Sequence, residues 1–179
     1  LIGVGVAFVV VGGLAVHAYR LSARLSHSNA KQRETETALR ETLLQHDAAV
    51  RAGGVGLWDW DLNTGNVSYS SEWKRQIGYE DHEIADDFQE WESRVHPEEL
   101  QAVLDHIKQA IESGDDGFQV EFRFCHKDGS YRWILAQASI MRDASGEARR
   151  VIGSHVDITR RKEAEAERRG ALEQQAVIL

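Results

Sequence analysis

Residues 118–141 read FQVEFRFCHKDGSYRWILAQASIM, and this stretch decides the fold. Apolar and polar residues alternate through its first eight positions, which is the period of a strand with one buried face. The turn Lys127-Asp128-Gly129 carries residue types that favour a chain reversal, and a second apolar run follows it. We therefore predict two antiparallel strands, Phe118–Cys125 and Tyr131–Met141.

Three further strands are predicted on either side of this pair. Val55–Leu62 (VGLWDWDL) alternates in period two, with Trp58 and Trp60 on one face and two aspartates on the other. A turn at residues 63–66 leads into Val67–Ser70, and a turn at residues 144–146 leads into Arg150–Ile158. The sequence thus contains two strands before residue 71 and three after residue 117.

The segment between these two groups of strands is predicted to be helical. Pro97 suits the first turn of a helix, and Gly114 suits its end. An apolar stripe lies between them at Leu100, Val103, Leu104, Ile107 and Ile111. The order of strands, helices and strands predicts an α+β fold, a five-stranded antiparallel sheet with helices on one face.

Composition excludes several classes of protein. The chain has 179 residues, of which 42% are hydrophobic, and five tryptophans, so it can form a packed core. Its net charge of −8 argues against a general nucleic-acid surface. Cys125 has no second cysteine for an intrachain disulfide. Because the chain begins at Leu1 and ends within a helical pattern, we expect it to be part of a longer protein.

The first segment, residues 1–19, reads LIGVGVAFVVVGGLAVHAY. As a helix it would be about 28 Å long, close to the hydrocarbon thickness of a bilayer. We predict a transmembrane helix here, in preference to a buried core helix, a signal peptide or a strand of a parallel sheet, which would be too short for the run. Basic residues follow without an acidic one up to position 33, at Arg20, Arg24, Lys31 and Arg33. This charge predicts anchoring in the inner membrane, with the rest of the chain on the cytoplasmic side.

Residues 20–50 have a mostly polar helical pattern that ends at Ala52-Gly53-Gly54. Steps of four and three residues give a heptad seam, so we predict a juxtamembrane coiled coil and a homodimer. The seam consists of Leu21, Leu25, Ser28, Gln32, Thr35, Leu39, Thr42, His46 and Ala49.

Five segments together resemble the PAS family, in the class with a contiguous PAC half. They are GLWDWDLNTG (56–65), SEWKRQIGY (71–79), RVHPEE (94–99), FRFCHKDGSYRW (122–133) and the ending Asp157-Ile158-Thr159. The resemblance covers about residues 47–162 and implies a PAS/PAC domain over residues 51–159. It further implies a pocket between sheet and helices, frequent dimerisation and a sensory role.

The resemblance also makes residues 160–179 a signalling helix that leads to an output domain or a second PAS domain. The output it suggests is a histidine kinase, with a diguanylate cyclase or a chemoreceptor domain as alternatives. We therefore expect a relay module of a membrane-bound signalling protein. A ligand-free dimerisation scaffold is the competing interpretation. No catalytic residue is indicated in the chain itself, because phosphate-binding loops, nucleophile elbows and metal-ligand spacings are missing from its sequence.

The pocket candidates are aromatic and aliphatic residues from strands and helices. They either line a cavity for a small molecule or simply fill the core. They are Trp58, Trp60, Tyr69, Trp73, Trp91, Ile107, Phe118, Val120, Phe122 and Phe124.

Asp157, Ile158 and Thr159 are the predicted relay residues, because they join the last strand to the charged helix that follows. Alternation places Asp157 on the face opposite Ile152 and Val156, the two residues we assign to the apolar face. Asp157 and Thr159 suit a helix cap, which is either a plain cap or one that switches partners. Arg160, Arg161 and Lys162 lie unfavourably in the first helical turn, so we expect acidic partners for them.

No cofactor is required by these residues. Photoreceptor members of the family use a cysteine in the helical region, whereas Cys125 is predicted on a strand, which argues against covalent flavin chemistry. Haem needs an axial ligand, and the candidate His96 lies at a helix entrance where capping is the simpler role. Non-covalent flavin stays open. Glu121, Arg123, Arg132 and Asp143 are expected to form cross-strand pairs on a solvated face.

Overall fold

The computed structural model describes residues 27 and 29–176. The chain divides into two compact units, residues 1–49 and 50–179, and each is described by itself. The second unit holds the sheet and its helices. Its elements, in chain order, are β1 (Gly56–Asp61), β2 (Val67–Tyr69), α2 (Ser71–Gln76), α3 (Phe88–Glu92), α4 (Pro97–Ser113), β3 (Gly117–Cys125), β4 (Tyr131–Arg142), β5 (Ala148–Asp157) and α5 (Thr159–Ala176).

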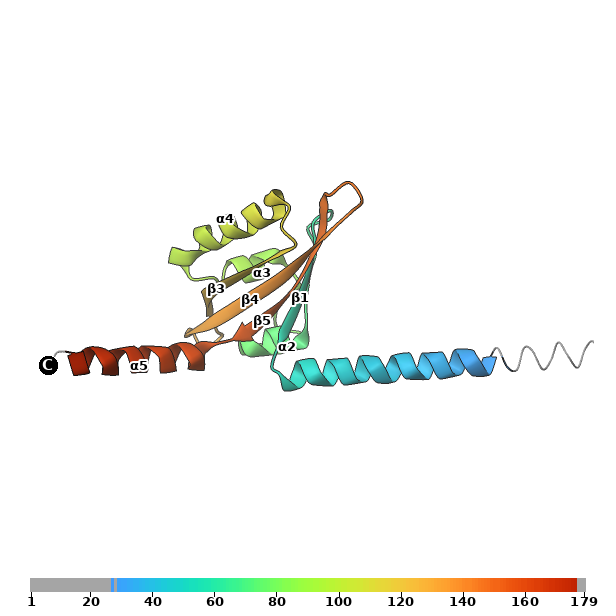
Figure 1. Ribbon diagram of the computed structural model, residues 1–179, viewed down its shortest axis with the longest axis horizontal. Coiled ribbons are helices and arrows are strands. Elements are labelled where there is room, and N and C mark those ends of the chain that lie inside the picture. Colours follow the sequence, from blue (N-terminus) through green and yellow to red (C-terminus); the bar gives the residue numbers. More distant parts are fainter. Residues whose placement is uncertain (1–26, 28, 177–179) are drawn as a thin grey trace, which may run out of the picture. The chain divides into compact units, whose positions relative to one another are not determined.

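The five strands form one sheet in the order β2-β1-β5-β4-β3, and every neighbouring pair is antiparallel. This confirms the predicted five-stranded antiparallel sheet. Figure 1 shows α3 and α4 on the same side of the sheet. The predicted strand bounds differ from the observed ones by one or two residues, which is the usual uncertainty at element ends.

Helix α4 begins and ends where the sequence predicts. Pro97 occupies its first position, and the side chain of His96 caps it by accepting a hydrogen bond from Glu98 N at 3.3 Å. The helix ends at Gly114, whose φ of 89° lies in the left-handed region that glycine adopts without a steric penalty. Val103, Ile107 and Ala110 are its buried residues, so one stripe of the helix faces the core.

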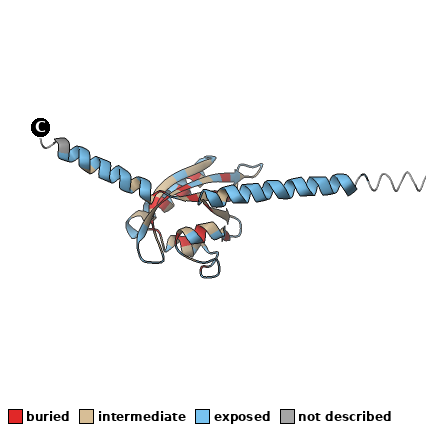
Figure 2. Ribbon diagram, turned by 90° about the horizontal axis from the view of Figure 1, so that it is seen from below, coloured by how far each residue is buried: buried red, intermediate tan, exposed pale blue. Residues whose placement is uncertain are grey.

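The core lies between the inner face of the sheet and helices α2, α3 and α4. Phe122, Phe124 and Ile134 from the sheet are completely buried, and they belong to one hydrophobic cluster with Trp73 of α2 and Trp91 of α3. Figure 2 shows the buried residues of this unit gathered where strands and helices meet. Such burial is the main stabilising contribution to the domain.

The inner face of β5 differs from our prediction. Val151 and His155 point into the core with exposed fractions of 0% and 3%, whereas Ile152 is 39% exposed and Val156 half-buried on the other face. Assigning the apolar face of this strand to Ile152 and Val156 was therefore wrong. The inner positions of β5 carry a glycine and a histidine, so local hydropathy indicated the opposite face.

Strand β3 is an edge of the sheet, and a short segment before α4 covers its C-terminal end. Val95 forms an isolated antiparallel bridge with Phe124. His96 N donates to Arg123 O at 2.9 Å, and Cys125 N donates to Arg94 O at 2.8 Å. These bonds satisfy backbone groups that an edge strand would otherwise present to another chain.

Residues 29–52 form the helix predicted for residues 20–50, as far as the structure describes it, and Gly54 follows with a φ of 59°. On the predicted seam, Thr35 and Thr42 donate their hydroxyls to carbonyls of their own helix. Seam residues 21, 25 and 28 and the predicted membrane segment 1–19 lie outside the described residues. Within the described part of the chain, no helix is both long and apolar enough to cross a membrane.

Candidate functional site: an aromatic cavity and the strand–helix junction

Small residues in the two central strands make room for a cavity on the inner face. Pairing across the sheet aligns Trp58, Gly153, Ala138 and Phe118 in one row. A Cβ atom on Gly153 would lie 2.2 Å from Trp58 Cζ2, so the indole needs glycine beneath it. Trp58 and Phe118 stack across the two small residues with ring centroids 6.4 Å apart. The rings of Trp58 and Phe118 thus extend over Gly153 and Ala138, and these two small residues form the floor of the space beneath the helices.

Above this floor lies a cavity of about 40 Å³. One water requires on the order of 10–15 Å³, so most of the inner space is filled by side chains. Eight of the ten predicted pocket residues line the cavity: Trp58, Trp60, Tyr69, Trp91, Ile107, Phe118, Val120 and Phe122. The other two, Trp73 and Phe124, are fully buried in the same core without lining it. That the cavity binds a ligand stays a prediction.

His155 also lines the cavity, and the sequence analysis missed it. His155 belongs to the next inward-facing row of the sheet, where its neighbours on the adjacent strands are Gly56 and Ala136. These two small residues leave space for the imidazole. The ring lies 5.6–6.1 Å, between centroids, from four aromatic rings: Trp58, Trp73, Phe122 and Phe124. This burial lowers the pKa of His155 to about 3, so the imidazole is neutral at ordinary pH.

Hydrogen-bonding groups around the cavity are incompletely satisfied. Trp58 Nε1 and Trp73 Nε1 are buried and have no hydrogen-bond partner among the described residues. The His155 backbone carbonyl accepts from Gln76 Nε2 at 2.8 Å. Tyr69, by contrast, donates its hydroxyl to Asp87 O at 3.1 Å, and burial raises its pKa. Buried polar groups without partners are uncommon in folded proteins.

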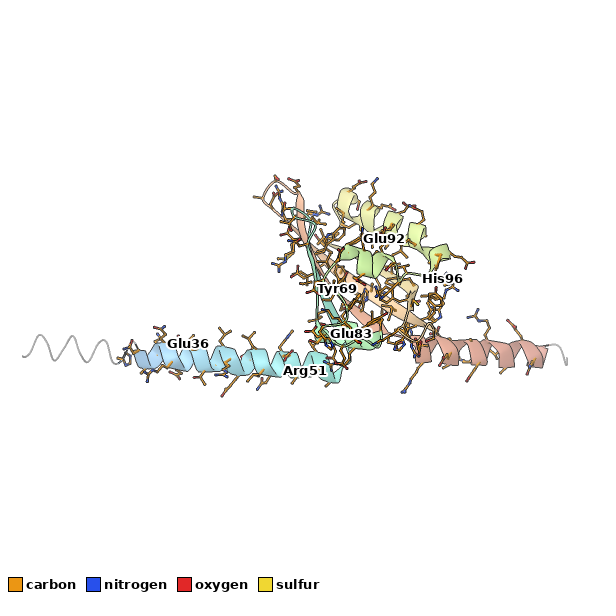
Figure 3. All side chains as sticks on the ribbon, turned by 180° about the vertical axis from the view of Figure 1, so that it is seen from behind. Glu36, Arg51, Tyr69, Glu83, Glu92 and His96 are labelled. Carbon is orange, nitrogen blue, oxygen red and sulfur yellow. The ribbon has the colours of Figure 1, made fainter. Side chains whose placement is uncertain are left out.

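The two residues considered from the sequence as cofactor ligands, His96 and Cys125, do not line the cavity. His96, the haem-ligand candidate, caps α4 and packs against Tyr131 with ring centroids 4.6 Å apart, and it does not line the cavity. Figure 3 shows His96 at the beginning of α4 and Tyr69 inside the domain. Cys125 lies at the end of β3, away from the cavity lining.

The predicted relay residues form a junction between β4 and α5. Asp157 Oδ1 accepts from Thr159 N at 2.8 Å, as expected for a cap. Thr159 does not cap its own helix, because its Oγ1 accepts from Trp133 N at 2.9 Å. Ile158 N donates to Trp133 O at 2.8 Å. Both backbone groups of Trp133 in β4 are therefore bonded to the start of α5.

The first turn of α5 is also bonded to the outer face of the sheet. Glu121 of β3 forms ion pairs with Arg161 and Lys162, each at 2.5 Å, and it is the acidic partner expected for these basic residues. Lys162, followed by Arg161, holds the pKa of Glu121 below its usual value. The Lys162 ammonium lies 5.0 Å from the centroid of the Trp133 ring. Residues from β3, β4 and α5 thus meet in one polar cluster.

The expectation of cross-strand pairs on this face was mostly wrong. Glu121 pairs with α5, and Arg123 reaches around the sheet edge to Glu98 and Glu99 of α4. Arg132 pairs with Asp128 in the adjoining turn. For Asp143 the expectation holds, because its partner Arg149 lies across the β4–β5 turn.

Comparison with known proteins gives one family and several relatives. The family described as "PAS fold" matches residues 66–155. The sensor protein FixL of Bradyrhizobium diazoefficiens is 34% identical over 112 residues, 63% of this chain. The probable diguanylate cyclase DgcE of Escherichia coli is 30% identical over 131 residues, 73% of this chain. This chain spans 22% and 12% of the lengths of these two relatives.

A solved structure of similar fold comes from Burkholderia thailandensis. It is a sensory box histidine kinase/response regulator, 32% identical to this chain, with a TM-score of 0.64. The match covers 74% of this chain and 98% of the solved one.

Proposed function

This chain belongs to the PAS-fold family, and we propose that it is the sensory and relay module of a larger signal-transduction protein. In this proposal, the cavity receives a ligand or the N-terminal segment receives a membrane-derived signal, and α5 passes the change onward. Relatives include sensor proteins and a probable diguanylate cyclase. We propose a histidine kinase as the output, with a diguanylate cyclase or a chemoreceptor domain as alternatives.

The main observation in favour of the relay is that β3 contacts the cavity with one face and α5 with the other. Val120 and Phe122 of this strand line the cavity, and Glu121 between them holds Arg161 and Lys162 of α5. Because neighbouring residues of a strand point to opposite faces, a shift of β3 moves the cavity wall and the anchor of α5 together. Trp133, paired with Arg123 of β3, adds a second attachment through its backbone.

The relay is tested in the complete protein that carries this chain. Asp157→Ala removes the side chain that accepts from Thr159 N at the start of α5, and Glu121→Gln removes the ion pairs of α5 with β3. We expect each variant to change the ratio of stimulated to unstimulated output. Glu112→Gln is the matched control, because Glu112 forms an exposed ion pair with Lys108 on α4. Output that stays unchanged with and without stimulus in both variants would remove the relay role.

Membrane anchoring on the cytoplasmic side is part of the proposal, supported by the apolar run of residues 1–19 and the basic residues after it. Deletion of residues 1–19 is expected to move the protein from the membrane fraction to the soluble fraction. A protein that stays in the membrane fraction after this deletion, with no other span in it, contradicts the anchor.

A ligand-free dimerisation scaffold is the second candidate, and exposed leucines favour it. Leu39, Leu43 and Leu44 of the N-terminal helix are 57–60% exposed, so their apolar surface is available for a second helix to bury. Of the three, Leu39 lies on the predicted seam. Sedimentation of the full chain is expected to give a dimer, and Leu39→Glu with Leu43→Glu is expected to give a monomer. A monomeric wild-type chain contradicts this role.

A further inference from the structure

The first half of β3 is an open edge of the sheet. Arg123 N donates to a glutamate carboxylate of α4 at 2.7 Å, and Arg123 O accepts from His96 N at 2.9 Å. Both backbone groups of Arg123 therefore point away from β4. Every second residue of an antiparallel strand directs its groups to the same side, which places those of Gly117, Gln119 and Glu121 on this edge as well. In the part of the chain that the structure describes, no hydrogen bond reaches these groups.

A hollow of about 200 Å³ lies beside this open edge, between β3 and α4. Unpaired N–H and C=O groups on an edge strand are a template for a further strand. The side chains of an added strand point alternately to the two faces of the sheet, so every second one would be directed toward α4 and into this hollow. Residues of both elements line it: His106, Gln109 and Ala110 of α4, and Phe118 and Gln119 of β3.

The acidic residues at the beginning of the open edge favour a basic partner. Asp115 lines the hollow, and the exposed Asp116 follows it. The Asp115 carboxylate accepts from Ser113 Oγ at 2.6 Å, and no Lys or Arg of the described residues forms an ion pair with either aspartate. Lys108, one turn earlier on α4, is paired with Glu112. Two carboxylates are thus left for a cation that the partner supplies.

The shape of the hollow also suits a long basic side chain. Lysine and arginine bury their apolar stems and keep their charged ends in a polar place. Here Phe118 and Ala110 provide apolar surface for the stem, and Asp115 provides the counter-charge. At the far end of the edge, Glu121 is already balanced by two basic residues of α5. The basic residues of a partner strand therefore belong at the Gly117 end.

A second copy of this chain fits the open edge less well. Pairing of two β3 edges would bring the acidic ends of both copies into the same interface. Like charges directly opposite each other destabilise a pair of strands. A segment of opposite charge avoids this repulsion.

We propose that the open edge Gly117–Glu121 binds an extended basic segment of a partner protein, which adds a strand to the sheet beside β3. The backbone groups of Gly117, Gln119 and Glu121 supply the hydrogen bonds, and Asp115 and Asp116 supply the preference for lysine or arginine. The proposal goes beyond the sensory function, because it requires neither a ligand in the cavity nor a movement of α5.

Three short peptides of about six residues, the usual length of a strand, test this on the full ¹⁵N-labelled chain. The first alternates lysine and valine and is capped at both ends. The second has the same sequence with N-methyl groups on two adjacent central residues, which blocks both of its edges. The third has glutamate in place of lysine. We expect the first peptide to bind saturably and to slow hydrogen exchange at the amides of Gln119 and Glu121. The other two are expected to leave this exchange unchanged.

A substitution on the edge tests the backbone hydrogen bonds. Gln119→Pro removes an N–H that points away from β4, which is the position where an edge strand accepts proline. We expect it to lower the affinity for the lysine peptide at least tenfold. Gln119→Thr is the matched control, because it changes the same side chain and retains the N–H. Its affinity is expected to equal that of the wild type.

A second pair of variants tests the charge. Asp115→Asn combined with Asp116→Asn is expected to lower the affinity for the lysine peptide about fivefold, the effect of two exposed charge pairs. Glu163→Gln combined with Glu167→Gln is the control, because it makes the same change in net charge at exposed positions of α5. This control is expected to bind as the wild type does.

Several results would overturn the proposal. They are equal binding of the N-methylated peptide or of the glutamate peptide, and unchanged affinity for the lysine peptide in Gln119→Pro or in the double aspartate variant. Protection of the Gln119 amide without peptide, lost on dilution, would show that a second copy occupies the edge instead. If Gln119→Pro does not fold, the N-methylated peptide provides the same comparison on the unaltered chain.

Discussion

The two faces of the sheet differ in chemistry although the same strands build both. The inner face is aromatic, the described residues that line its cavity include no Asp, Glu, Lys or Arg, and the lining imidazole of His155 is neutral. The outer face carries the ion pairs that attach α5. Phe122 is 0% exposed, and its neighbour Glu121 is a half-exposed anion. This difference indicates that the inner face contributes most of the stability of the domain, whereas the outer face provides the connection to α5.

The largest expected effect comes from opening the inner face. Phe122→Ala removes a completely buried ring from the centre of the core and should lower the free energy of unfolding by about 3–5 kcal/mol. Gln119→Ala, at an exposed outer position of the same strand, should change it by less than about 0.5 kcal/mol. Urea unfolding followed by tryptophan fluorescence measures both. Similar losses of unfolding free energy in the two variants would contradict the difference between the inner and outer faces.

Acid should lower the free energy of unfolding of the domain through His155, which lies on the inner face. Its pKa is about 3 in the folded protein against 6.5 in the unfolded chain, so below pH 6.5 the unfolded chain binds a proton that the folded protein does not. Stability is thus fully present above pH 6.5 and falls as the pH drops toward 3. The loss from pH 7 to pH 5 should be roughly 2 kcal/mol.

His155→Phe should remove this part of the pH dependence, which urea unfolding at a series of pH values measures. Exposed His82→Phe should retain it. A His155→Phe variant with the wild-type slope between pH 7 and pH 5 would show that the loss arises elsewhere.

Gly153 tests the close approach of Trp58 to the sheet. An added methyl group at 2.2 Å from the indole forces the ring to shift, so Gly153→Ala should cost about 1–3 kcal/mol. Gly170→Ala is the matched control, because nothing lies near that position in helix α5 and alanine favours helix by about 1 kcal/mol. The two substitutions are expected to have opposite signs in thermal unfolding. Equal signs would contradict the packing described for the inner face.

The smallest effect on stability is expected on the outer face. Glu121→Gln removes exposed ion pairs worth less than about 1 kcal/mol. Because the pKa of Glu121 is lowered in the folded state, its contribution is present above pH 4.5 and fades as the pH falls through the lowered value. Hydrogen exchange of the amides in the first turn of α5 should accelerate at pH 7 in this variant. Unchanged exchange would show that the junction at Trp133 alone holds the helix.

Much of the fold follows from local patterns in the sequence. The alternation in residues 118–125, the turn at Lys127-Asp128-Gly129 and the proline at position 97 predict the elements that the structure contains. The inner face of β5 was missed because Gly153 and His155 are not apolar in sequence. Their burial depends on Trp58 lying above the glycine, and that contact joins residues far apart in the chain.

For the same reason, the sequence predicted some residues of the site and missed others. Aromatic residues at alternating positions are visible in sequence, and most of them line the cavity. His155 gives no such signal, although its spacing of two residues from Gly153 and four from Val151 places it on their face. Partners of the charged residues were mostly mistaken, because Glu121 and Arg123 pair with helices 24–41 positions away rather than with the neighbouring strand.

The covering of the β3 edge restricts how this domain can assemble. Arg94 and His96 already use the backbone groups of β3 on either side of Phe124. At the other end of the sheet, β2 is three residues long, and Tyr69 N there donates to the Asp86 carboxylate. Growth of the sheet by an added strand from another molecule is thus disfavoured at β2 and at the C-terminal end of β3. Sheet-to-sheet merging of neighbouring domains in a crowded array is opposed at these two places.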